Sequence, residues 1–112
     1  MAEHGGPADA VSGQTTAMTG TSDTSLIAAQ GSGVRTYIDT LTFTNNHATV
    51  ATDVAIKDGT TERWRVRVAA GGCETVPFAT PLRGSANTAW QAANVTTGSS
   101  VIVSAAGFKG SA

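Results

Sequence analysis

The chain has 112 residues and a mass of 11.2 kDa, which is the size of one compact domain. Charged residues are 13% of the sequence and the formal net charge is −1, which excludes a coiled coil and excludes nucleic-acid binding through bulk positive charge. No apolar run approaches the ~18 residues of a membrane-spanning helix. We therefore expect no direct nucleic-acid partner and no membrane partner.

Two further features bear on the cell compartment. Cys73 is the only cysteine, so the chain has no internal disulfide and no zinc site built from cysteines. The first basic residue is Arg35, so the N-terminus lacks the positive region of a secretory signal. We expect synthesis in the cytoplasm.

The beginning of the chain differs from the rest in composition. Up to Ser25 there is no Leu, Ile, Phe, Trp or Tyr, while Gly, Ser and Thr are frequent. Such a segment buries too little apolar surface to offset the entropy that it loses on ordering. We predict a flexible N-terminal arm over residues 1–23, either a disordered tail or an arm that becomes ordered on a partner. A folded domain over residues 24–109 and a C-terminal tail over residues 110–112 follow.

The first strands of the domain are predicted from β-prone composition and from alternation of apolar and polar side chains. Residues 25–28 form a short candidate strand. Residues 34–45 form a long one, whose alternation breaks between Ile38 and Leu41. A β-bulge would absorb the extra residue.

The clearest pattern is a β-hairpin around Asp58-Gly59. Residues 50–57 alternate before this pair, and residues 63–68 alternate after it. Two alternating runs across an Asp-Gly turn predict a hairpin. We expect its apolar side chains to belong to one core: Val54, Ile56, Trp64 and Val66.

Three further strands are predicted towards the C-terminus. Residues 74–78 form a short one, which Pro77 and Pro81 confine to a sheet edge or to the first residues of a strand. Residues 88–95 and 99–108 form a last pair.

Roughly seven or eight short strands without a helical segment predict an all-β fold, an antiparallel β-sandwich or barrel. Large apolar side chains are few, so Ala and Thr must fill much of the core. A small domain with a thin core is marginally stable alone. We expect a homo-oligomer formed through sheet edges or faces, a dimer in preference to a trimer because two-fold pairs are the commonest assembly.

No arrangement of residues in the sequence predicts catalysis. His4 lies in the arm and His47 in a turn, and neither has a carboxylate at the spacing of a catalytic triad. The turn accounts for Asp58 and the strand end accounts for Glu62, so no glycosidase pair is predicted. Two histidines and Cys73 do not make a closed metal site. We expect no enzymatic activity, no cofactor and no metal ion.

Arg63, Arg65 and Arg67 are the one unusual cluster of charge. At a period of two residues, the three guanidinium groups project from one face of the sheet. One interpretation is a solvated outer face: Asp53 and Lys57 lie across the hairpin, so that part of the stripe is ion-paired. The other is a docking stripe for an acidic protein surface, since Arg forms bidentate contacts with carboxylates.

The order of several short motifs resembles that of small proteins encoded by tailed bacteriophages and prophages. The motifs are TVATDVAIKDGTTERW at residues 49–64, AAGG at 69–72, Phe78, PLRGSANTA at 81–89 and GFK at 107–109. Each motif consists largely of residues that favour turns, so the resemblance lies in the order of the motifs. It covers residues 24–109. The Gly- and Thr-rich arm departs from the family pattern.

These proteins are similar to jelly-roll virion components, especially capsid decoration or cement proteins. The resemblance implies a jelly-roll-like sandwich that binds the major capsid protein on the outer capsid surface and stabilises the shell. An extended arm over residues 1–23 would reach ~75 Å, enough to cross from one capsid subunit to the next. The alternative is a head or tail fibre module that binds a receptor or glycan, for which Tyr37 and Trp90 are the candidate aromatic residues.

Overall fold

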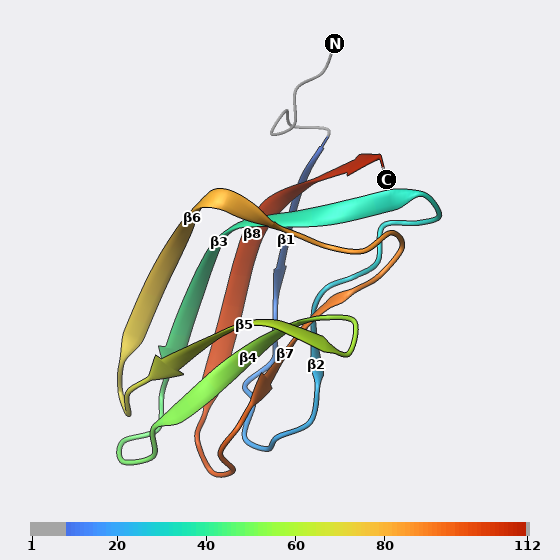
Figure 1. Ribbon diagram of the computed structural model, residues 1–112. Helices are drawn as coiled ribbons and strands as arrows, with labels where there is room; N and C mark the ends of the chain where they lie inside the picture. The colour runs from blue at the N-terminus through green and yellow to red at the C-terminus, as the bar shows by residue number, and fades with distance from the viewer. Residues whose placement is uncertain (1–8, 112) are drawn as a thin grey trace.

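The computed structural model describes residues 9–111, which form an antiparallel β-sandwich of two four-stranded sheets (Figure 1). Sheet A has the strand order β1-β8-β3-β6, and sheet B has the order β2-β7-β4-β5. The strands are β1 (Ala10–Gln14), β2 (Thr24–Ile27), β3 (Val34–Asn45), β4 (Thr52–Asp58), β5 (Thr61–Val68), β6 (Cys73–Arg83), β7 (Trp90–Asn94) and β8 (Val101–Ser111). Eight strands distributed over two sheets in this way form a jelly roll. The predicted all-β sandwich is confirmed.

The core lies between the two sheets and takes side chains from both. Its largest fully buried members are Trp90, Phe43, Ile38, Leu41, Ile56 and Val54. Trp64 and Val66 of β5 pack against this cluster and remain half-buried. The Trp64 ring stacks on Phe43 at 5.9 Å and meets the edge of Phe78 at 5.3 Å. The prediction of one core across the hairpin is therefore confirmed.

The hairpin and the bulge of β3 also agree with their sequence patterns. β4 and β5 join at Asp58-Gly59, where Gly59 has a φ of 65°, a left-handed conformation that favours glycine. In β3 the register against both neighbouring strands shifts between Ile38 and Thr40. This shift makes Asp39 the bulged residue, and it returns Leu41 to the core face.

β6 is an edge strand of sheet A, as its prolines require. Pro77 pairs with Thr40 of β3, and the strand continues past Pro81 to Arg83. The strand is therefore longer than the predicted residues 74–78. Figure 1 shows it at the outer side of its sheet, curving over the top of the sandwich.

The boundary predicted at residue 24 is wrong for part of the arm. Residues 10–14 are β1, which pairs with β8 from Ala10 opposite Phe108 to Gln14 opposite Ser104. Met18 is buried and forms a bridge to Val101. A strand pairs through its backbone N–H and C=O groups, so β1 needs no large side chains of its own.

The other residues of the predicted arm and of the predicted C-terminal tail either lie outside the described residues or belong to a strand. Residues 1–8 of the predicted arm and Ala112 lie outside the described residues. Gly110 and Ser111 of the predicted C-terminal tail belong to β8, where Ser111 pairs with Val34. Residues 9–111 include no helix that is long and apolar enough to cross a membrane.

Gly13 allows β1 to close one side of the sandwich. A Cβ atom at this position would collide with the backbone carbonyl of Leu26 in β2. The absence of a side chain therefore lets the edge of sheet A approach the edge of sheet B.

We expect Gly13→Ala to destabilise the protein by about 1–3 kcal/mol, because a backbone group must move to admit the methyl group. Gly20→Ala is the matched control, since a Cβ there meets nothing within 4 Å. Thermal unfolding measures the effect. Equal melting temperatures for the two variants would contradict the contact between β1 and β2.

Candidate functional site

The three arginines lie on β5, an edge strand of sheet B, and they do not form a single row. Arg65 and Arg67 point outward, and Arg67 pairs directly with Asp53 of β4. Arg63 is the extra residue of a β-bulge, because the residues on either side of it pair with consecutive residues of β4. The prediction that all three project together is therefore wrong for Arg63.

Arg65 and Arg67 are ion-paired on the outer face of sheet B. Asp53 lies 3.0 Å from Arg67 and 3.8 Å from Arg65. Glu62 accepts two hydrogen bonds from Arg65, of 3.0 and 2.7 Å. These bonds lower the pKa of the Glu62 carboxyl and raise the pKa of the Arg65 guanidinium.

The same face carries a third cation, Lys57, which binds Asp23 at 2.7 Å. Each of the three cations thus has an acidic partner, and the charge of this face is locally balanced. The pairs are exposed, so each contributes little to stability. The Arg67 side chain is 71% exposed and donates to Asp53 from one nitrogen, which leaves further donors of its guanidinium directed at solvent.

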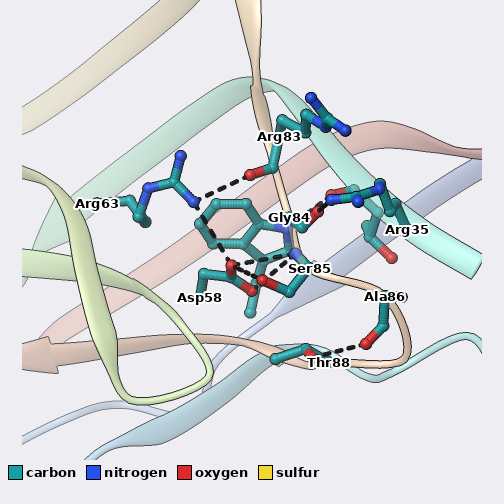
Figure 2. A network of polar contacts seen from close by, with 10 residues as sticks. Arg35, Asp58, Arg63, Arg83, Gly84, Ser85, Ala86 and Thr88 are labelled. Atoms are coloured by element: carbon teal, nitrogen blue, oxygen red, sulfur yellow. Dashed lines mark hydrogen bonds and ion pairs between the residues drawn. The ribbon is translucent and has the colours of Figure 1, made fainter. Parts of the chain in front are cut away.

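Arg63 belongs to a different cluster, centred on the carboxylate of Asp58 (Figure 2). The Asp58 side chain is 5% exposed. It accepts a hydrogen bond of 2.6 Å from the Ser85 hydroxyl, and both of its oxygens lie 3.0–3.1 Å from the Ser85 backbone nitrogen. Arg63 approaches the same carboxylate at 3.5 Å and donates to the carbonyl of Arg83 at 3.2 Å.

The loop that presents Ser85 is fixed by its neighbour Gly84. The Gly84 nitrogen donates to the carbonyl of Thr36 at 3.0 Å, and the Trp90 indole N–H donates to the same oxygen at 2.9 Å. Arg35 donates to the Gly84 carbonyl at 2.9 Å. A Cβ at Gly84 would lie 2.6 Å from the Thr36 oxygen and 2.9 Å from the indole nitrogen, so only glycine fits.

The Asp58 cluster joins two of the motifs that carry the family resemblance. Asp58 and Gly59 belong to DGTT, and Ser85 belongs to PLRGSANTA. A second contact reinforces the first, because the Gly59 nitrogen donates to the carbonyl of Ala89 at 2.9 Å. Gln91 also donates to the Gly59 carbonyl at 2.9 Å. The two motifs therefore form one structural unit.

The role of Ser85 was not visible in the sequence. In the sequence the turn alone accounts for Asp58, and nothing in the spacing connects it with a serine 27 residues away. The one sequence feature that could have indicated this contact is Gly84, the glycine that precedes Ser85. Chemically, the arrangement holds a buried carboxylate on hydrogen-bond donors and fixes a loop.

The other candidates for chemistry are accounted for by local structure. The Nδ1 atom of His47 accepts hydrogen bonds from the backbone of Thr49 and Val50, both at 3.1 Å, so this histidine shapes its own turn. Within residues 9–111, no group of three or more His, Cys, Asp or Glu side chains is placed to hold a metal ion. His4 lies outside the described residues.

The two candidate aromatic residues of a glycan-binding module have different positions. Trp90 is completely buried in the core. Tyr37 is half-buried on the outer face of sheet A, where its ring stacks on Phe108 at 4.7 Å. Tyr37 is thus the one of the two with accessible surface.

A scan against protein-family models finds no match to this sequence, and a search of curated proteins finds none either.

The geometry of the Asp58 cluster predicts which of its partners matters for stability. We expect Ser85→Ala to destabilise the protein by about 1.5–3 kcal/mol, because it removes a short hydrogen bond to a buried carboxylate. Arg63→Ala should cost about 1 kcal/mol or less, since its contact is long and its side chain is partly exposed. Denaturant unfolding of both variants gives the comparison. A larger loss for Arg63→Ala would contradict the assignment.

Proposed function

We propose that this chain is a structural virion protein that binds the major capsid protein on the outer surface of a tailed-phage capsid and stabilises the shell. Synthesis takes place in the host cytoplasm, and the protein then acts as part of the virion. The role needs no catalytic group, cofactor or metal ion. It needs a rigid body and a surface that recognises protein.

The observation that carries the proposal is the contact between DGTT and GSANTA. The resemblance to capsid decoration proteins is a resemblance in motif order, and short turn motifs taken singly say little. Here the Asp58 carboxylate of one motif is bound by Ser85 of the other at 2.6 Å. Their common occurrence in one chain therefore has a physical basis, which supports treating the motif order as the mark of one fold. The function is proposed from the resemblance of this motif order to that of capsid decoration proteins.

The outer face of sheet B suits docking on such a shell. Arg65 and Arg67 are exposed there and held by Asp53 and Glu62, so their guanidinium groups are oriented before a partner arrives. Carboxylates of a capsid subunit can use the donors that remain. Many copies bound to one shell add their individual contributions to its stability.

The alternative, a fibre module that binds a receptor or glycan, is less well supported. Such a site displays aromatic rings beside polar groups. Trp90 is unavailable because it is buried, and Tyr37 already stacks on Phe108. The experiment below separates the two functions.

We expect the purified protein to co-sediment with undecorated capsids of the phage that encodes it, and to saturate at a fixed number of copies. Arg67→Glu should weaken binding by about tenfold, equivalent to ~1.4 kcal/mol, and added salt should weaken the wild type. Lys109→Glu is the control, because it makes the same change of charge in β8 of sheet A.

Protein that stays in the supernatant at every concentration and salt would overturn capsid binding. Binding to host cells or to cell-surface glycans in that case would favour the fibre module. Equal losses for Arg67→Glu and Lys109→Glu would leave capsid binding in place but remove the outer face of sheet B as the docking surface.

A further inference from the structure

The edges of both sheets are protected against pairing with another strand. In sheet A, β6 carries Pro77 and Pro81, which lack the N–H that an added strand would bind. In sheet B, β5 carries the bulge at Arg63 together with two more arginines. Bulges, prolines and charges are the usual devices that block edge-to-edge association.

The opposite edges are protected in a different way. β1 has five residues and lies against β2 through Gly13. β2 has four residues, and its register against β7 shifts between Ser25 and Ile27. A short, interrupted strand is a poor template for another chain. A face of the sandwich is therefore the better surface for the association of two copies.

Three neighbouring rows on the outer face of sheet A consist of uncharged side chains, many of them with hydroxyl groups, and we call them the hydroxyl grid. Residues that pair across neighbouring antiparallel strands project from the same face, so the register defines its rows. The rows are Ser12–Ala106–Thr40–Pro77, Gln14–Ser104–Thr42–Thr75 and Ile102–Thr44–Cys73. All of these residues are half-buried or exposed, and none is charged.

The outer face of sheet B has the opposite character. Its outward positions include the charged residues Asp53, Lys57, Glu62, Arg65 and Arg67. A second copy would cover that face with the same balanced set of charges and remove these ion pairs from water, and this desolvation can exceed their mutual attraction. To cover the hydroxyl grid removes no charge from water.

We propose that the hydroxyl grid is the self-association surface of this protein and that a second copy of the chain covers it in a two-fold contact. In such a contact the same patch faces itself. A hydroxyl group both donates and accepts, so a row of Thr and Ser is complementary to its own copy. The hydroxyls of Thr40, Thr42 and Thr75 have no hydrogen-bond partner among the described residues, so they are free to pair.

The size of the face sets the strength of the contact. Four strands at ~4.8 Å and the three rows of the hydroxyl grid at ~6.8 Å span ~400 Å². The adjoining row, Ala10–Phe108–Tyr37–Arg83, carries one arginine at its β6 end and extends the face to ~500 Å². Two copies bury ~1,000 Å² in total, the lower end of specific interfaces. Short side chains lose little rotamer freedom when they are covered. The dimer is therefore weak in free solution, and it does not depend on capsid binding.

Sedimentation equilibrium of the full chain tests this inference, from low micromolar concentration upward. The wild-type mass should rise from one copy to two and should change little with salt. Thr42→Arg places a charge at the centre of the grid and should raise the dissociation constant at least about tenfold. Ser25→Arg is the control, because it adds the same charge at an exposed position of β2.

Circular dichroism checks that each variant folds, and Ser104→Arg on β8 replaces Thr42→Arg if that variant does not. Four results would overturn the inference. The first three are a mass of one copy at all concentrations, a limiting mass of three copies, and equal dissociation constants for Thr42→Arg and Ser25→Arg. The fourth is dissociation by salt alone, because it would place the contact on the charged face of sheet B.

Discussion

The buried indole of Trp90 links the two sheets, and the hydrogen bonds that join Thr36, Gly84, Ser85 and Asp58 depend on its position. Trp90 belongs to β7 in sheet B, and its N–H donates to the carbonyl of Thr36 in β3 of sheet A. The same oxygen accepts from Gly84, which positions Ser85 on Asp58. An indole N–H buried without an acceptor would be costly, so this oxygen fixes the spacing of the sheets and the course of the loop together.

The outer faces of the two sheets carry different kinds of side chain. Sheet B displays arginines and carboxylates that neutralise one another, whereas the hydroxyl grid of sheet A displays uncharged side chains. This division lets one surface meet a charged partner while the other stays free for contact with an identical copy. The proposals for shell binding and for self-association thus use different surfaces and can fail separately.

The sequence revealed what alternation and turn chemistry encode. The hairpin at Asp58-Gly59, the bulge at Asp39 and the edge position of β6 all follow from local rules. It did not reveal β1, since that strand is held mainly by backbone pairing with β8 and by the close approach at Gly13, and Val11 is its one apolar side chain packed against the core. Nor did it reveal the hydrogen bond between Asp58 and Ser85, because a contact between loops that are distant in the chain leaves no repeating pattern in the sequence. Local patterns predict strands, and only the packed fold brings their ends together.

The hydrogen bonds of the Asp58-Gly59 turn also bear on chemical ageing. Asp-Gly sequences are prone to isomerise through a cyclic imide, which forms when the glycine nitrogen attacks the aspartate carboxyl carbon. Here the Gly59 N–H is directed at Ala89, and both carboxylate oxygens of Asp58 are held by Ser85. Neither reacting group is free to turn towards the other. The contact that shapes the loop therefore also slows the isomerisation of Asp58-Gly59.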